Sequence, residues 1–408
     1  MLSSTFPYPP SRGGTQVRTF NLLKYLSRRH NVILGTVRSP DVTDAQIDAL
    51  QQHVAKLAVF ETPIAVSTGL GGKFHRFSQF LLSGTPPNVL SSYSIAMQNW
   101  ADELVASGQC DAVTCEHSVN EIYVRPEWRQ KLLTVANIHS SVWGTCREML
   151  ATGTSQKPLR DRLNLPLLAR YETRYCSKFS RIVATTSTDK QQLLELLSPQ
   201  RRGREDLFVP TIDVIPNGVD LVEFPYRSID PGGHTLIFAG AMNNLPNIDA
   251  AQFLSLQILP LLQQRYPDST LTLVGTSPVP SVLALGKLPG IQVVGRVQRV
   301  AEYLHQAAVC VVPMRIGFGI KNKTLEAMAA GTPVVASDRG LEGLAVDGDS
   351  QPTRALRANK VQEYVEAISS LFENQQLRQE LSLSARSLIQ TEYTWDIIGR
   401  QYDRLLQF

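Results

Sequence analysis

The stretch Ala308–Ser337, AVCVVPMRIGFGIKNKTLEAMAAGTPVVAS, holds the pattern that decides the fold. Its first apolar run ends at Val312, just before a proline, and predicts a buried strand. Gly317 and Gly319 then predict a tight turn, and residues 325–330 are good helix formers. A second apolar run closes the stretch. We therefore expect a strand, a glycine turn, a helix and a further strand, in that order.

The start of this helix is where we expect an anion to bind. Asn322 stands at the position of a helix N-cap, while Gly331 and Pro333 mark the end of the helix. The first amide N–H groups of a helix point out of its N-terminus and give that end a partial positive charge. Lys321 and Lys323 add positive charge at the same end, which favours a phosphate group as the ligand.

Short apolar runs alternate with helical patterns on both sides of a turn-rich segment at residues 217–233. This alternation predicts an α/β fold of two tandem Rossmann-like, doubly wound domains with a ligand cleft between them. We place the first domain at residues 1–222 and the second at residues 223–391. Residues 392–408 form a last helix, which we expect to cross back and pack on the first domain. Its apolar face comprises Trp395, Ile398, Tyr402 and Leu405.

Several other segments carry clear helical or strand patterns. The helical patterns include residues 15–29, 167–179 and 249–264. The opening strand, at residues 1–4, is short for a parallel sheet, and we expect it to be clipped. Between residues 62 and 95 the pattern is hard to interpret. Phe74, Phe77, Leu81 and Leu82 there predict an amphipathic helix that packs on the domain or, alternatively, meets a hydrophobic or lipid-linked acceptor.

Composition excludes several classes of function. The 408 residues carry a formal net charge of +4, so no nucleic-acid partner is expected. The five cysteines are widely spaced and form neither a C-x-x-C pair nor a Cys/His cluster, which indicates a reducing compartment and no metal site. No apolar run approaches the roughly 20 residues that span a bilayer, and a signal-peptide pattern is absent. We expect a cytoplasmic protein, with membrane association left open.

Motifs along nearly the whole chain resemble the retaining glycosyltransferases of the GT-B fold, in the group 1 or family 4 clan. The matching segments are FPYPPSRGGTQVR near the start, IPNGVD at 215–220, FAGAMNNLPNIDA at 238–250, VVGRV at 293–297, GFGIKNKTLEAMAAGTPVVAS and the terminal YTW. Each motif is weak alone, but together they occur in the expected order. The FAGAMNNLPN variant resembles the sub-group that assembles exopolysaccharides and cell-surface sugars.

The resemblance assigns roles to residues of the first half. Gly13 and Gly14 match the loop that approaches the donor diphosphate, where a side chain would obstruct the ligand. Lying at the end of a predicted strand, His139 matches the histidine beside the transferred sugar. His117, at the end of another predicted strand, is similarly placed and remains a competitor for this role.

The resemblance also assigns donor contacts in the second half. Glu326 matches the acidic residue that accepts hydrogen bonds from the ribose hydroxyls. Thr324 and Leu325 are expected to contact the diphosphate through their backbone. Arg296 either stacks on the nucleobase or is solvated. The remaining donor-binding residues implied by the motifs are Gly295, Val297, Gly317 and Gly319.

One departure from the family pattern matters for the chemistry. The family carries a first glutamate before the Glu326 match, but this sequence has Phe318 at that position. The basic residues that follow the first strand of the second domain are also replaced, by AMNNLPN. We expect Lys323, Arg315 and Lys321 to supply the missing positive charge for the leaving nucleoside diphosphate, with Lys323 the first choice and solvated loop positions the alternative. We count His139, Lys323 and Arg315 as the catalytic candidates.

The leading hypothesis is transfer of a sugar, with retention of configuration, from a nucleoside-diphosphate sugar to a glycan or lipid-linked acceptor. Beyond this co-substrate no cofactor or metal is expected, and contact with the inner face of a membrane stays an option. The missing glutamate favours an alternative, a non-catalytic nucleotide-sugar-binding scaffold. An epimerase or a phosphorylase-like enzyme ranks lower because no cofactor lysine context is visible. A dehydrogenase would need G-x-G-x-x-G where this chain has SRGGTQV.

Overall fold

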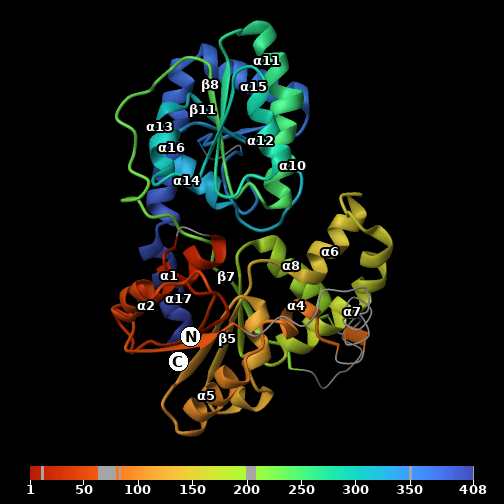
Figure 1. Cartoon of the computed structure of the whole chain (residues 1–408), viewed down its shortest axis with the longest axis vertical. Coiled ribbons are helices and arrows are strands. Elements are labelled where there is room, and N and C mark those ends of the chain that lie inside the picture. The colour runs from red at the N-terminus through yellow and green to blue at the C-terminus, as the bar shows by residue number, and fades with distance from the viewer. Residues whose placement is uncertain (11–12, 63–79, 82–83, 199–207, 349–351, 408) are drawn as a thin grey trace. The chain divides into compact units, whose positions relative to one another are not determined.

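Two parallel β-sheets form the centres of the computed structural model, one in each half of the chain (Figure 1). The structure describes residues 1–10, 13–62, 80–81, 84–198, 208–348 and 352–407. Two compact units divide the chain, one of Met1–Pro216 with Gly399–Phe408 and one of Asn217–Ile398. The predicted class, two Rossmann-like α/β halves, is confirmed. The predicted domain limits lay at residues 222 and 391.

The sheet of the first unit has seven strands in the order β3-β2-β1-β4-β5-β6-β7. These strands are β1 (Leu2–Ser3), β2 (Ile33–Arg38), β3 (Lys56–Glu61), β4 (Ala112–Glu116), β5 (Leu133–Asn137), β6 (Arg181–Ala184) and β7 (Thr211–Val214). Its helices include α1 (Gly14–Leu26), α2 (Asp44–Gln51), α4 (Pro87–Leu90), α5 (Ile95–Ala106), α6 (Val142–Ala151), α7 (Pro158–Cys176) and α8 (Ser187–Leu196). The strand order reverses between β1 and β4, and ligands of such sheets bind beyond the carboxyl ends of the strands at this point.

The second unit repeats the plan with six strands in the order β10-β9-β8-β11-β12-β13. They are β8 (Thr235–Ala239), β9 (Thr270–Val274), β10 (Ile291–Gly295), β11 (Val309–Val312), β12 (Val334–Ala336) and β13 (Leu356–Arg357). Its helices include α10 (Leu245–Phe253), α11 (Leu259–Arg265), α12 (Pro280–Leu283), α13 (Val300–Gln306), α14 (Asn322–Ala330), α15 (Val361–Glu373) and α16 (Gln375–Glu392). Here the order reverses between β8 and β11. The expected ligand-binding edge of this sheet therefore lies beside Gly240, which follows β8.

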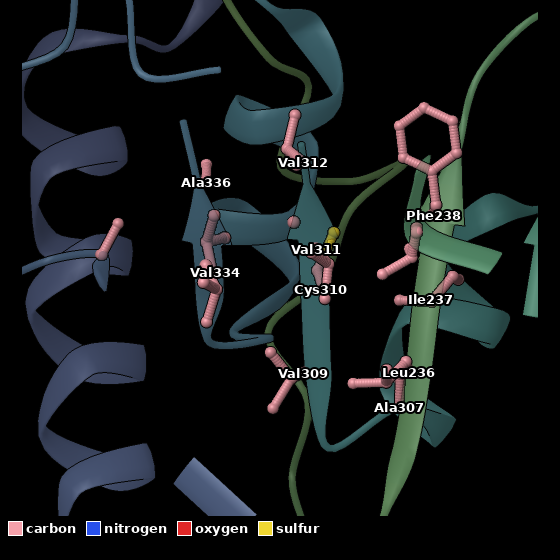
Figure 2. Close-up of a cluster of buried hydrophobic side chains, with 14 of the residues drawn as sticks. Leu236, Ile237, Phe238, Ala307, Val309, Cys310, Val311, Val312, Val334 and Ala336 are labelled. Carbon is pink, nitrogen blue, oxygen red and sulfur yellow. The ribbon is translucent and has the colours of Figure 1, made fainter. Parts of the chain in front are cut away.

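The stretch from residue 308 to 337 forms the middle of this second sheet. Every residue of β11 is buried, between β8 on one side and β12 on the other (Figure 2). Helices cover both faces, with α13, α14 and α16 on one and α10, α11, α12 and α15 on the other (Figure 1). A strand buried on both faces is apolar at every position, which explains why its sequence is a continuous run rather than an alternation.

Three predicted helices need correction at their boundaries. The helix expected at 167–179 begins at Pro158, and the helix expected at 249–264 is α10 and α11 joined by a π-helical segment, Leu254–Ile258. The N-cap of α14 is Lys321, not Asn322. Asn322 is the first helical residue, and its Oδ1 accepts a hydrogen bond from Asn217 Nδ2 at 2.8 Å instead of capping the helix. Phe74, Phe77 and Leu82 lie outside the described residues.

The C-terminal helix α17 (Trp395–Leu406) begins in the second unit and continues in the first from Gly399 onward. The four residues predicted for its apolar face are all buried. Within the first unit, Asp403 accepts hydrogen bonds from Arg29 at 2.8 Å and pairs with His30 at 2.6 Å. In the described part of the chain, no helix is both long and apolar enough to cross a membrane.

Candidate functional site

Lys323 lies at the strand end of the second unit, directly beside Gly240. Its Nζ donates a hydrogen bond to Asn247 Oδ1 at 2.5 Å and lies 4.4 Å from the centre of the Phe238 ring. The first turn of α14 thus points its lysine at the loop that follows β8. A Cβ at position 240 would lie 2.8 Å from Lys323 Nζ, so the lysine occupies space that only a glycine leaves open.

The surroundings of Lys323 lower the pKa of its side chain. Burial lowers the pKa of Lys323 to about 7, and the positive charge of Lys321 acts in the same direction, while Glu326 opposes both. A lysine in this state gains its full charge when an anion arrives. The site therefore has a cation that a phosphate group would stabilise.

Glu326 lies one helical turn after Lys323. Burial raises the pKa of the Glu326 carboxyl to about 7; Lys323 opposes this shift and Glu223 adds to it. Among the residues that the structure describes, none donates a hydrogen bond to this carboxylate. Glu326 is half-buried and lacks a donor in the described part of the chain, so its carboxylate is open to hydrogen bonds from a ligand.

The glycine turn before α14 is held in shape by Lys321. Gly317 has φ 94° and Gly319 has φ 77°, the left-handed region that glycine adopts without strain. Lys321 is 8% exposed; its Nζ donates to the Gly319 carbonyl and pairs with Glu342 at 3.5 Å. Lys321 therefore braces the loop, whereas Lys323 faces the strand end.

Thr324 and Leu325, expected to contact a diphosphate through their backbone, are engaged inside the helix. Their N–H groups donate to the Lys321 carbonyl at 3.0 and 3.3 Å, and both side chains are fully buried. The amide groups that can point out of this helix end belong to the first turn. Of this turn, Asn322 and Lys323 are the two helical residues that precede the engaged amides of Thr324 and Leu325.

Arg315 and Arg296 are placed differently from Lys323. The Arg315 guanidinium binds both oxygens of Asp249, at 2.5 and 3.0 Å, and lies over the Phe253 ring. The positive charge of Arg315 is therefore already paired with a carboxylate of α10. Arg296 follows β10 and is exposed, next to Val297 and after Gly295 at φ 78°. The structure thus brings Lys323 and Glu326 together and gives Arg315 a separate partner.

Phe318, which stands in place of the family's first glutamate, has its ring against a cationic side chain. The Arg339 guanidinium lies 4.3 Å from the centre of its ring, and Arg339 also pairs with Glu342 at 3.3 Å. Glu342 therefore connects Arg339 with Lys321. This pairing around the glycine loop was missed by the sequence analysis because Glu342 follows the next strand and carries no motif.

In the first unit, His117 and His139 lie together at the ends of β4 and β5. Their ring centres are 5.1 Å apart, so the two competitors for one role share one location. His117 Nδ1 accepts a hydrogen bond from Val119 N at 3.3 Å. Burial lowers the pKa of both imidazoles; for His139, His117 and Arg18 contribute as well. Both side chains are therefore neutral at pH 7 and offer hydrogen bonds rather than charge.

A buried polar network that the sequence analysis missed lies at the ends of β4 and β5, the strands that precede these histidines. Asn137 Nδ2 donates to both oxygens of Glu116, at 3.1 and 2.9 Å, and to Tyr402 Oη at 2.8 Å. Arg18 donates to the carbonyls of Pro216 and Ile215, at 2.8 and 3.0 Å. Burial raises the pKa of Glu116, with Arg18 opposing. The only sequence signal was a polar residue ending each of two apolar strands.

Gly13 and Gly14 begin helix α1. Gly13 is the N-cap with φ 174°, an extended conformation that any residue adopts, and Gly14 is the first helical residue. Both are exposed. A Cβ at position 13 would come no closer than 3.9 Å to another atom, Gln16 Oε1. Nothing inside the described part of the chain requires glycine at this position, so a requirement would have to come from a ligand.

The sequence matches two family models. Residues 12–223 match Glycosyltransferase Family 4, and residues 233–374 match Glycosyl transferases group 1. A phosphatidyl-myo-inositol mannosyltransferase of Mycolicibacterium smegmatis is 29% identical over 202 residues, which cover 47% of this chain and 51% of the relative. The match thus spans about half the length of this curated relative.

Solved structures with the same fold cover nearly the whole chain. A sucrose-phosphate synthase of Thermosynechococcus elongatus superposes with a TM-score of 0.70 at 17% identity, covering 99% of this chain and 97% of its own. The Anabaena protein HepE, crystallised with UDP, superposes with a TM-score of 0.66 at 14% identity, covering 99% and 98%. At these identities, the similarity establishes the fold.

Proposed function

This chain belongs to the group 1 glycosyltransferases, with a family 4 first half, and we propose that it transfers a sugar from a nucleoside-diphosphate sugar to a glycan or lipid-linked acceptor. We further propose retention of configuration and a place in cell-surface polysaccharide or glycoconjugate synthesis on the cytoplasmic side. The observation that carries the proposal is the strand end of the second unit, where Lys323 lies beside the glycine that follows β8 and Glu326 lies one helical turn after Lys323.

The strand end that carries Lys323 is suited to stabilise a nucleoside diphosphate as it leaves the sugar. When the bond from the sugar to the diphosphate breaks, negative charge grows on the phosphate oxygens. Lys323 and the first amides of α14 supply positive charge there without a metal ion. Glu326 supplies acceptors for two ribose hydroxyls. HepE binds UDP on the same fold, which supports a uridine nucleotide as the first donor to try.

The first unit supports transfer without a covalent enzyme intermediate. Its strand-end histidines are neutral and suited to hydrogen-bond sugar hydroxyls. Glu116, which directly precedes His117, is 1% exposed and engaged by Asn137 and Thr114, so it is a poor candidate for a nucleophile. Attack by the acceptor hydroxyl on the same face as the leaving diphosphate retains the configuration and needs no such nucleophile.

The test is donor turnover with labelled UDP-, GDP- and ADP-sugars, following release of the nucleoside diphosphate and transfer to added glycans. Lys323→Met is expected to lower kcat about 100- to 1,000-fold, as loss of a charge-stabilising group does. His139→Ala is expected to lower it less. Lys360→Met, at an 83% exposed lysine, serves as the matched control and should leave turnover unchanged. Equal turnover in Lys323→Met and wild type would contradict the proposal.

Phe318 favours a second candidate, a nucleotide-sugar-binding scaffold without catalysis. In relatives the glutamate at this position contacts the donor sugar, whereas here the aromatic ring pairs with Arg339. A scaffold predicts that a nucleoside diphosphate raises the melting temperature while no donor is turned over. Turnover of any one donor, abolished in Lys323→Met, would exclude it.

A further inference from the structure

Helix α7 packs against α6 through one of its faces. Asp161, Asn164 and Leu168 recur every three or four residues along α7, and all three line the space between the two helices. Figure 1 shows this pair of helices at the edge of the first unit. Residues of α7 that are offset from these three by half a helical turn therefore point away from α6.

Two leucines stand on that opposite face, which we call the outer face of α7. Leu159 is 77% exposed and Leu163 is 65% exposed. They lie one helical turn apart, so their side chains project in the same direction. Pro166 and Arg170 continue the face at intervals of three and four residues, and both are exposed. Single exposed leucines are common on protein surfaces, but a neighbouring pair on one helix face indicates a surface that another molecule covers.

Unpaired positive charge surrounds these leucines. Lys157, Arg162 and Arg170 are exposed, and no carboxylate of the described residues pairs with any of them. Between the first and the last of these positions the sequence holds one acidic residue, Asp161. It lies on the side toward α6 and pairs with Arg160 at 2.9 Å. The outer face of α7 is therefore apolar and cationic, without a negative charge of its own.

A bilayer with anionic headgroups fits this face better than a protein partner does. A stable protein–protein interface buries about 800 Å² on each partner around an apolar core, which two leucines do not supply. A leucine can instead insert singly between lipid chains, as in helices that lie in the plane of the interface. Long basic side chains reach the headgroups while their methylene stems lie along the apolar layer. Their charges are complementary to anionic lipid phosphates.

We infer that the outer face of α7 docks on an anionic lipid bilayer. Leu159 and Leu163 enter the edge of the apolar layer, and the neighbouring cations contact lipid phosphates. The inference goes beyond the proposed function by locating a membrane contact. For the acceptor it rests on that function, because a chain held at a bilayer meets a lipid-linked acceptor there.

Vesicle co-sedimentation of the full chain, without a donor, tests the docking. The probes are vesicles of phosphatidylcholine alone and with about 30 mol% phosphatidylglycerol, in about 0.15 M salt. Wild type is expected to bind the anionic vesicles at least about 10-fold more tightly than the neutral ones. The double variant Leu159→Ser with Leu163→Ser should weaken binding to anionic vesicles at least about 10-fold. Arg162→Gln with Arg170→Gln should also weaken it at least about 10-fold.

Matched changes in the second unit serve as controls. Leu383→Ser removes a leucine that is 61% exposed, and Lys360→Gln removes a lysine whose side chain is 83% exposed. Both variants should bind anionic vesicles as wild type does. All these positions are exposed, so none of the changes should lower the melting temperature. Loss of vesicle binding in the α7 variants at an unchanged melting temperature supports the docking, whereas a lowered melting temperature would mean that the leucines are packed in the fold and would overturn it.

Hydrogen exchange locates the contact on the chain. Peptides within residues 157–170 should exchange more slowly when anionic vesicles are added, and they should not respond to neutral vesicles. Slower exchange in other peptides with none in this range would place the contact elsewhere and contradict the inference.

Three further results would overturn it. They are no preference of wild type for the anionic vesicles, unchanged binding in both α7 double variants, or a wild-type dimer that becomes a monomer in Leu159→Ser with Leu163→Ser, which would assign the face to a second copy of the chain. Failure of the proposed function is recognised separately, as donor turnover that is absent while vesicle binding remains intact. Donor turnover onto a soluble glycan by a wild-type chain that binds neither kind of vesicle would refute the docking alone.

Discussion

Lys323 and Glu326 both have pKa values of about 7, reached from opposite directions. Lys323 is charged below this pH and neutral above it, so its attraction for a diphosphate weakens as pH rises. Glu326 is charged above this pH and protonated below it, so its ability to accept ribose hydroxyls weakens as pH falls. We predict that affinity for a nucleoside diphosphate is greatest near pH 7, as measured by titration calorimetry from pH 5.5 to 9.

Two variants separate the limbs of this profile. Glu326→Gln accepts through its amide oxygen at every pH and should flatten the acidic limb, leaving the alkaline limb in place. Lys323→Arg stays charged throughout and should flatten the alkaline limb. Burial lowers the pKa of His117 and of His139 below the ordinary value, so neither imidazole supplies the alkaline limb. An affinity independent of pH in wild type would contradict the assignment.

Gly240 gives a second test at the residue scale. In Gly240→Ala the new methyl group would lie 2.8 Å from Lys323 Nζ and 2.9 Å from Asn247 Nδ2. Both are ends of side chains that can move, so we expect a small loss of stability but a displaced lysine. Affinity for the nucleoside diphosphate should fall about 10-fold, the loss expected for one charge-assisted hydrogen bond.

The matched change is Gly286→Ala, which places a methyl group 3.3 Å from Val293 Cγ2 in the same unit. It tests whether a new methyl group near a strand weakens nucleotide binding in general, and it should leave affinity unchanged. Thermal unfolding of both variants gives the stability. If Gly240→Ala binds the nucleotide as tightly as wild type, the observed place of Lys323 is not the one used in binding.

Among the elements, α17 carries an unusual glycine. Replacing a glycine inside a helix with alanine ordinarily stabilises it by roughly 0.5–1 kcal/mol. At Gly399, however, a Cβ would lie 2.2 Å from Tyr25 Cγ, against a ring held in the core. We predict that Gly399→Ala destabilises the protein by at least about 1–3 kcal/mol, as overpacking does, measured by urea unfolding. Gln401→Ala, at an exposed site of the same helix, should be neutral; stabilisation by Gly399→Ala would contradict the packing.

Elements whose pattern is local were predictable, and elements that depend on distant partners were not. The run at β11 and the glycine turn before α14 predicted both elements. Helix α6 was missed because its start depends on Glu172, which comes from α7 and satisfies its first amides. The beginning of α7 was missed because Leu159 and Leu163 are exposed there and give no apolar face.

The same distinction holds for the candidate site. Lys323 and Glu326 share a helix, so their spacing alone predicted that they would lie one turn apart. His117 and His139 were predicted at strand ends, but their contact requires β4 and β5 to be neighbours. The network of Asn137 with Tyr402 joins residues 265 positions apart, a separation at which no sequence pattern operates.

At the scale of the whole molecule, both units follow one plan. In each sheet the first strand of the unit pairs with its fourth, β1 with β4 and β8 with β11. The polar and glycine positions discussed above follow these strands or their neighbours at the carboxyl ends. Parallel strands bring such positions to one edge, so a repeated strand order yields one candidate ligand edge in each unit. The proposed function assigns the nucleotide to the edge in the second unit.

Hydrogen exchange measured by mass spectrometry tests this division over the whole chain. At about 100 times its Kd, a nucleoside diphosphate adds about 2.7 kcal/mol to the free energy of opening wherever opening releases it. We predict slower exchange in residues 238–247 and 314–330, which include Gly240, Asn247 and Lys323. Peptides spanning β4 and β5 should be unaffected by the nucleotide alone.

Hydrogen exchange in residues 13–18 tests whether the first unit takes part in donor binding. No atom of the described chain needs a glycine at position 13, so a role there depends on the ligand approaching the exposed start of α1. If Gly13 and Gly14 contact the diphosphate, exchange in residues 13–18 should slow with the nucleotide, and Gly13→Val should abolish that protection because a branched side chain would exclude the ligand. The 238–247 peptide would report weaker binding in the same sample. Protection confined to the second unit, unchanged in Gly13→Val, would show that the nucleotide is held by the second unit alone.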